Sequence, residues 1–251
     1  MLTYSVEGPI AWATLDRPDR MNAMVRSFWT EVVDVMARAD ADPDVRVVIF
    51  KGEGRAFSVG GDIEGFGDID GTADRRNYLN EAMAAFRAVE NANTPSIAAV
   101  HGYALGGGCE LTLVCDIVVA DETAKFGMPE AAVGLVPGLG VVRGRAHVNL
   151  HWMKYMVLTG ESLGAHDARS AGLVNEVVPA GEHLARAEAL GHTIAKKAPL
   201  ALAVGKRILG RDADEGFTHA IEAVALLQGT DDHAEGIAAF VDRRPALFEG
   251  R

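Results

Sequence analysis

The stretch SIAAVHGYALGGGCELTLVCDIVVA, residues 96–120, places a glycine triplet between two apolar runs. Ser96–Val100 and Asp116–Ala120 are short and apolar, as strands buried on both faces of a sheet are. Glu110–Val114 lies between them and predicts a short helix. A strand, a glycine-rich turn, a helix and another strand in succession indicate an α/β fold.

The triplet Gly106–Gly108 is costly in regular structure, because glycine loses the most backbone freedom on folding. A tight turn that enters a helix would account for it. The start of a helix also presents unpaired N–H groups and the positive end of the helix dipole. Glycines there would let a planar carbonyl group approach the backbone and would form half of an oxyanion hole. Both interpretations fit these residues taken alone.

A second glycine pair lies in the loop Gly54–Asp62, GRAFSVGGD, which also follows an apolar, strand-like run. Two loops that follow neighbouring strands can each offer a backbone N–H to one oxygen atom. This loop is therefore the natural source of a second donor.

The elements around this centre extend the same pattern along the chain. We expect a hairpin formed by Leu2–Val6 and Ile10–Leu15, and helices over Asn22–Ala39 and Arg75–Asn91. Val45–Phe50 predicts a buried strand, and Val174–Val178 predicts one late strand. After Pro129 the rest of the pattern is almost wholly helical. The sequence thus predicts an α/β core followed by a helical C-terminal region.

The composition sets limits on the class of protein. The chain has 251 residues, 49% of them hydrophobic, and a net charge of −11 with no basic run. This charge argues against nucleic acid or an anionic membrane as partner. No apolar run is long enough to span a bilayer, and the amino terminus does not resemble a signal peptide. Cys109 and Cys115 fit neither a zinc site nor a disulfide framework, so we expect a reducing, cytoplasmic compartment.

Other candidate sites are weaker. The glycines from Gly102 to Gly108 do not form a dinucleotide or P-loop motif. Asp68–Gly71 lacks the remaining ligand spacing of a calcium loop, and no metal site is predicted. We expect His101 to be a hydrogen-bonded structural histidine and Cys109 a small packing residue.

Three segments together resemble the enoyl-CoA hydratase/isomerase (crotonase) family: AFSVGGDI (Ala56–Ile63), HGYALGGGCELTLVCDI (His101–Ile117) and FGMPEAAVGLVPGLG (Phe126–Gly140). LDRPDRMNAM (Leu15–Met24) and TDDHAEGIAAFVDRRPALF (Thr230–Phe248) fit the same family. The resemblance covers essentially the whole chain, with its motifs in order.

The resemblance implies a crotonase-like spiral of ββα turns over residues 1–195. It also implies a C-terminal helical region over residues 196–251 that assembles homotrimers, often paired into hexamers. The substrate would be an acyl-CoA thioester, with no metal and no cofactor beyond the coenzyme A that the substrate carries.

The resemblance also assigns roles to residues. The thioester oxygen would lie between the backbone N–H groups of Ser58 and Gly107, and Glu110 and Glu130 would be the two catalytic carboxylates. Arg17 and Arg20 would approach the CoA phosphates, and Asp62 and Ile63 would line the adenine pocket. Further substrate-binding positions are implied at Ala56, Gly60, Gly106, Pro129 and Gly138.

Two carboxylates that face one water suit the addition of water across a 2-enoyl-CoA. An isomerase can work with one carboxylate, and other family members hydrolyse thioesters or act on C–C bonds. A non-catalytic acyl-CoA-binding scaffold is a further alternative, which the presence of both glutamates disfavours. The charge of −11 disfavours the RNA-binding role known in the family.

One segment departs from the family pattern. The family commonly reads PG-x-GGTQRLPR, whereas residues 137–149 read PGLGVVRGRAHVN, with Val141 at a glycine position and Gly144 at the usual arginine position. This segment is expected to start a helix close to the substrate. The loop Glu64–Asn80 is expected to shape the acyl pocket.

Overall fold

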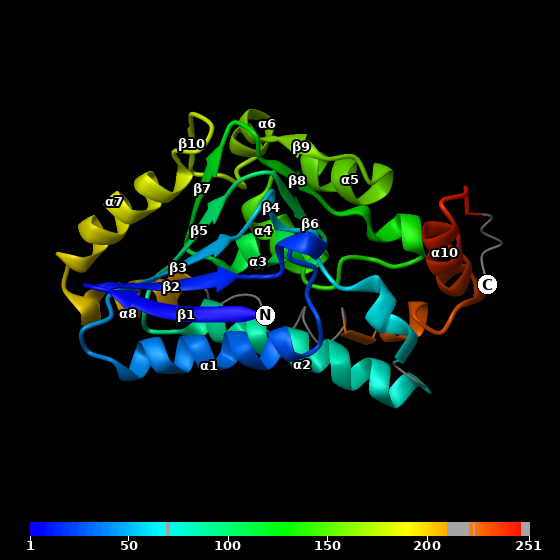
Figure 1. Ribbon diagram of the computed structural model, residues 1–251, viewed down its shortest axis with the longest axis horizontal. Coiled ribbons are helices and arrows are strands. Elements are labelled where there is room, and N and C mark those ends of the chain that lie inside the picture. Colours follow the sequence, from blue (N-terminus) through cyan, green and yellow to red (C-terminus); the bar gives the residue numbers. More distant parts are fainter. Residues whose placement is uncertain (69–70, 210–220, 223, 247–251) are drawn as a thin grey trace.

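The computed structural model describes residues 1–68, 71–209, 221–222 and 224–246. Its larger sheet has the strand order β1-β2-β3-β5-β7-β10 (Figure 1). The strands are β1 (Leu2–Glu7), β2 (Ile10–Leu15), β3 (Val47–Gly52), β5 (Ser96–Val100), β7 (Ile117–Asp121) and β10 (Glu176–Val178). The hairpin strands β1 and β2 pair antiparallel, and every other neighbouring pair is parallel.

A smaller sheet has the order β4-β6-β8-β9, formed by β4 (Ala56–Ser58), β6 (Tyr103–Leu105), β8 (Lys125–Gly127) and β9 (Leu163–Gly164). The chain adds to both sheets in turn, because β3 is followed by β4, β5 by β6 and β7 by β8. Helical segments close these turns: η2 (Ile63–Asp68) with α2 (Gly71–Asn91), α3 (Gly107–Val114) and η3 (Pro129–Val133). This is the predicted spiral of ββα turns.

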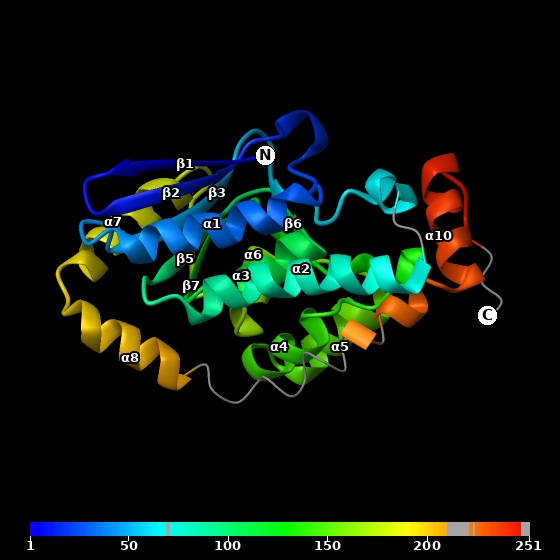
Figure 2. The same ribbon diagram turned by 90° about the horizontal axis from the view of Figure 1, so that it is seen from below.

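The larger sheet is covered on both faces. On one face α7 (His183–Ala195) packs against β3, β5 and β7, where Val47 and Ile49 belong to the buried cluster. On the other face Val48 and Phe50 join α1 (Ser27–Ala41) and α2 in the main core. Figures 1 and 2 show the sheet between these two layers. Successive residues of a strand point to opposite faces, so a strand covered on both sides is apolar throughout.

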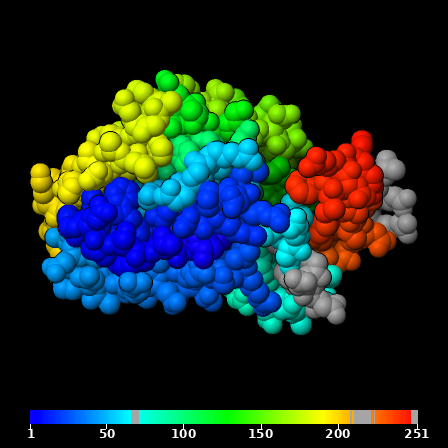
Figure 3. Space-filling view, viewed as in Figure 1, coloured from blue at the N-terminus to red at the C-terminus, as the bar shows by residue number. Residues whose placement is uncertain are grey.

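The remaining helices follow the last strands: α4 (Gly140–His147), α5 (Leu150–Thr159), α6 (Ala165–Ser170), α8 (Pro199–Leu209) and α10 (Asp231–Asp242). Helix α10 packs against η3 and forms one end of the molecule, in red in Figure 3. In the part of the chain that the structure describes, no helix is both long and apolar enough to cross a membrane. The predicted division after residue 195 falls at the end of α7 and stays a prediction.

Three predicted helix starts were wrong. The helix expected from Arg75 begins four residues earlier, at Gly71. The helix expected from Asn22 begins at Ser27, because Met21 and Asn22 have positive φ and Met24 exchanges backbone hydrogen bonds with the loop at Gly60–Asp62. The helix expected from Glu110 begins three residues earlier, at Gly107. The late strand is also shorter than expected and covers only Glu176–Val178.

Candidate active site

Glu110 lies in the first turn of α3 and is almost fully buried. Its Oε1 accepts hydrogen bonds from the backbone N–H groups of Leu139 (2.9 Å) and Gly140 (2.8 Å), at the start of α4. Burial raises the pKa of Glu110, while these two donors favour its ionised form and oppose the rise. The start of α4 therefore fixes the orientation of this carboxylate.

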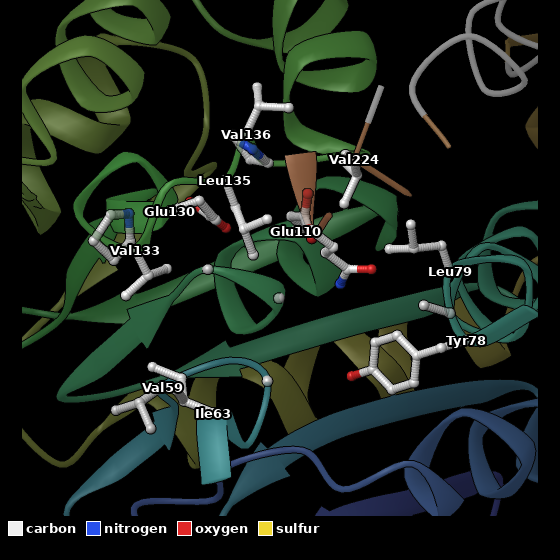
Figure 4. Close-up of a pocket in the computed structure, with 18 of the residues that line it drawn as sticks. Val59, Ile63, Tyr78, Leu79, Glu110, Glu130, Val133, Leu135, Val136 and Val224 are labelled. Atoms are coloured by element: carbon white, nitrogen blue, oxygen red, sulfur yellow. The ribbon is translucent and has the colours of Figure 1, made fainter. Parts of the chain in front are cut away.

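Glu130 follows Pro129 in the first turn of η3 and lines the same pocket as Glu110, as Figure 4 shows. Its Oε2 is buried and has no hydrogen-bond partner among the described residues. Burial, and then the nearby negative charge of Glu110, raise the pKa of Glu130 to about 8. The two carboxyl groups thus differ, since Glu110 has two backbone donors from α4 that Glu130 lacks.

The glycine triplet starts α3 and frees several backbone donors. The intrahelical hydrogen bonds begin with Glu110 N–H to Gly106 O (2.9 Å), so the N–H groups of residues 107–109 have no partner within the helix. Gly106 has φ 50° and ψ −127°, and a Cβ there would lie 3.2 Å from Glu130 Oε1. Glycine at this position therefore lets the Glu130 carboxyl pack against the helix start, beside Gly107.

Ser58 ends β4 in direct backbone contact with the same helix, since a Cβ on Gly108 would lie 2.4 Å from Ser58 O. The fully buried Ser58 hydroxyl donates to Asn22 O (2.8 Å) and accepts from Gly60 N–H (3.1 Å). The Ser58 side chain is thus engaged in holding its own loop. Ser58 does not line the pocket, although its neighbours Val59 and Gly61 do.

Asn22 is a supporting residue that the sequence analysis missed. It is fully buried at φ 58°, and its Nδ2 donates to Glu53 O (2.9 Å) and Ala56 O (2.8 Å). It thereby ties the segment after Arg20 to both ends of the loop before Ser58. Only its residue type within the opening motif LDRPDRMNAM could have pointed to it, because asparagine tolerates positive φ better than most residues.

The predicted substrate-binding residues divide into two groups. The pocket lining includes Ile63, Gly106, Gly107, Glu110, Pro129, Glu130 and Gly138, and does not include Arg17, Arg20, Ala56, Ser58, Gly60 or Asp62.

The two arginines predicted at the CoA phosphates are paired with acidic side chains. Arg17 Nη1 donates to Asp62 Oδ2 (2.6 Å) and to Ala23 O (3.1 Å), which joins two loops. Arg20 is exposed and pairs with Glu64 (3.1 Å). Their roles toward phosphate stay predictions.

The cavity beyond the glutamates has a volume of about 200 Å³ and largely apolar walls. Several walls come from residues that the sequence analysis did not single out: Trp29, Tyr78, Leu79, Ala82, Met83 and Phe86 from α1 and α2, and Val224, Gln228 and Phe240 from the C-terminal region. An apolar residue at helical spacing looks the same in sequence whether it faces a core or a pocket.

The segment 137–149, which departs from the family pattern, contacts Glu110 through the backbone N–H groups of Leu139 and Gly140. A Cβ on Gly144 would lie 2.4 Å from Met153 Cε, so Met153 fills the space beside this glycine. Arg143, one residue earlier, is buried and forms an ion pair with Glu90 of α2. The altered helix is thus anchored to α2 while its first N–H groups bind Glu110.

His101 and Cys109 lie where a structural role requires. His101 Nε2 lies 2.9 Å from Gly54 O, and its ring stacks on that of His183 with centroids 4.8 Å apart. Burial raises the pKa of the Cys109 thiol, which disfavours a nucleophilic thiolate. In the segment Asp68–Gly71, residues 69–70 lie outside the described residues.

Comparison with known proteins agrees with this architecture. The family model described as enoyl-CoA hydratase/isomerase matches residues 5–251. The chain is 37% identical to the 2,3-dehydroadipyl-CoA hydratase of Escherichia coli strain K12, over 100% of this chain and 99% of that protein. It is 35% identical to a probable enoyl-CoA hydratase of Mycobacterium bovis, over 95% of this chain and 93% of that protein.

A solved structure gives the same result for the fold. The carnitinyl-CoA hydratase of Mycobacterium avium superposes with a TM-score of 0.88 at 34% identity, covering 100% of this chain and 98% of that one. The spiral of ββα turns and the family motifs in order therefore have one explanation: this chain is an enzyme of the enoyl-CoA hydratase/isomerase family.

Proposed function

We propose that the protein adds water reversibly across the 2,3 double bond of a 2-enoyl-CoA thioester. The observation that carries this proposal is the pair of buried carboxyl groups, Glu110 and Glu130, which line one pocket beside the start of α3. Hydration requires one group to take a proton from water and another to give a proton to carbon. The pair supplies both from one side of the substrate.

The thioester oxygen would accept hydrogen bonds from the backbone N–H groups of Gly107 and Ser58. These donors lie on adjacent segments, and the positive end of α3 adds to the attraction for negative charge. As water adds at C3, charge develops on this oxygen as an enolate, which fixed donors stabilise more than the starting thioester. The oxyanion hole therefore lowers the barrier rather than only tightening binding.

The two glutamates would take different roles. Glu110, with two N–H donors on its Oε1, is the easier of the two to ionise and would accept the proton of the attacking water. Glu130, whose pKa is raised to about 8, would be protonated at neutral pH and donate to C2. The products are the 3-hydroxyacyl-CoA and an enzyme whose single proton has moved between the carboxyl groups. Water and thioester are the only reactants, so we propose no cofactor.

The pH profile tests this assignment. Because the acid form of Glu130 is required, kcat/KM for hydration should fall as the pH rises through about 8. Initial-rate assays that follow the loss of enoyl-thioester absorbance from pH 6 to pH 10 would measure kcat/KM at each pH. A rate that increases through pH 8 would contradict the role of Glu130 as acid.

The substrate itself is tested by a turnover screen against 2-enoyl-CoA and 3-enoyl-CoA thioesters of different length and branching. Hydration of a 2-enoyl-CoA supports the proposal. Conversion of a 3-enoyl-CoA without hydration would instead support the isomerase reaction, which one carboxylate can perform.

We also propose that the protein assembles as a homotrimer or as a pair of trimers. Large apolar side chains are exposed on α5, α8 and α10, among them Leu158 (77% exposed), Leu200 (80%) and Phe240 (62%). Leu200 and Val204 (51% exposed) lie one turn apart on α8, and a contiguous exposed apolar face marks an interface more often than scattered side chains do. Light scattering should give a mass of three or six chains, and a fully active monomer would contradict this.

A further inference from the structure

Gln228 places a polar group in the wall of an otherwise apolar part of the pocket. It lines the cavity with Val224, whose carbonyl oxygen accepts a hydrogen bond from the backbone N–H of Gln228 (2.9 Å). The residue as a whole is only 6% exposed. Its Oε1 is buried and accepts no hydrogen bond from any described residue. A buried amide oxygen without a hydrogen-bond donor lowers the stability of the folded protein, and a donor on a bound ligand would remove that penalty.

If the proposed function holds, the Gln228 side chain lies where the far end of the acyl chain would be bound. In Figure 4, Val59 and Ile63 lie below and to the left of Glu110, whereas Val224, Leu79 and Tyr78 lie to the right of it. Coenzyme A is predicted on the side of Ile63, so the acyl chain beyond C3 would run toward Val224 and thus toward Gln228. The far end of the acyl chain then meets a hydrogen-bond acceptor.

The charges around the pocket narrow the chemistry of that end. The described lining contains no lysine or arginine, and it contains Glu110 and Glu130. Within this lining, a carboxylate at the end of the acyl chain would have no counter-charge, which is strongly unfavourable. Arg75, whose Nη1 would lie 3.4 Å from a Cβ on Gly229, lies outside the lining. A hydroxyl group can donate to the amide oxygen and can also accept from the amide nitrogen, so it fits either orientation of the glutamine side chain.

We propose that Gln228 is a specificity-determining residue that binds a hydroxyl group on the distal acyl chain of the substrate, which makes hydroxylated 2-enoyl-CoA thioesters the preferred class. The inference deepens the proposed function and rests on it for the direction of the acyl chain. The hydrogen bond from the hydroxyl group also satisfies the buried amide oxygen, so the hydroxylated chain should bind about tenfold more tightly than an apolar chain of equal length.

Binding tests this without turnover. Calorimetry would compare three saturated acyl-CoA thioesters of equal length, ending in methyl, hydroxyl or carboxylate, over chains from four to ten carbons. At the length that reaches Gln228, wild type should bind the hydroxylated thioester about tenfold more tightly than the methyl one, and the carboxylate most weakly. No preference for the hydroxyl at any length would overturn the proposal, as would a preference for the carboxylate.

Two variants assign the effect to the amide. Gln228→Leu should bind the methyl and hydroxyl thioesters equally, whereas Val224→Ala, which changes an apolar wall one turn away, should keep their ratio. A Gln228→Leu protein that keeps the hydroxyl preference would overturn the assignment. Because the thioesters are saturated, a failure here is distinct from a failure of wild type to hydrate any 2-enoyl-CoA.

The melting temperature gives an independent measure. Gln228→Met, close in length and without the unpaired oxygen, should melt no lower than wild type in the absence of ligand. A loss of several degrees in both the Met and the Leu variants would show that the amide is bonded within the protein and would contradict the proposal.

Discussion

Replacing Glu110 or Glu130 by glutamine is expected to slow the hydration of a 2-enoyl-CoA by about 10²–10⁴-fold. Glutamine keeps the size of the side chain and, at position 110, an oxygen that can still accept from Leu139 and Gly140. It removes the group that accepts a proton at position 110 and the group that donates one at position 130. The loss of conjugated enoyl-thioester absorbance measures the rate for each variant.

The double variant shows whether the two carboxyl groups act as one unit. It should be about as slow as either single variant, because removing one partner already disables proton transfer. Glu161→Gln, at an exposed position, is the matched control and should keep the wild-type rate. If one of the two single variants hydrates at the wild-type rate, the two-carboxylate mechanism is wrong.

Gly107→Pro is expected to lower kcat by about 10²-fold or more, because it removes one N–H from the proposed oxyanion hole. Proline is well tolerated at the first position of a helix, so α3 can still form. Gly107→Ala is the matched control: it keeps the N–H, and its Cβ would lie in ordinary contact, 3.4 Å from Met24 Sδ. Steady-state kinetics on both variants, with circular dichroism to verify folding, makes the comparison.

The Ser58 hydroxyl should matter much less for the rate. It bonds Asn22 and Gly60 within its own loop, so Ser58→Ala should lower stability by about 1–3 kcal/mol while keeping most activity. Two results would argue against an oxyanion hole built from backbone donors. One is a folded Gly107→Pro enzyme that keeps most of the wild-type rate. The other is a folded Ser58→Ala enzyme whose rate falls by about 10²-fold or more, as is expected for Gly107→Pro.

The sequence predicted the α/β class and the strands of the larger sheet in their order along the chain, because strands covered on both faces are apolar throughout. Ser96–Val100 is such a run, and β5 has those bounds. The sequence did not predict the short strands β4, β6, β8 and β9 of the smaller sheet. It did not predict where α1 starts, because the bend at Met21 and Asn22 depends on hydrogen bonds to a loop more than thirty residues away. Local propensity carries no information on such contacts.

The motifs indicated both glutamates and Gly107, and the structure brings these three into one pocket lining. They could be found because glycine and a charged residue stand out in an apolar sequence. Gln228 and Met83 could not be found in the same way. Their position depends on how α2 and the C-terminal region pack around the cavity, which no single segment encodes.

The spiral places the groups proposed for chemistry and the far walls of the cavity on largely different elements, which the ion pair between Arg143 of α4 and Glu90 of α2 connects. The groups proposed for chemistry lie where strands of the smaller sheet end, at Ser58, just after β6 at Gly107 and after β8 at Glu130. The far walls of the cavity belong to α1, α2 and residues 224–240. Mutations in those helices can change which acyl group fits while the strand pairing that places the reacting atoms is inherited unchanged. Such an architecture lets a lineage diversify in substrate while it conserves one reaction.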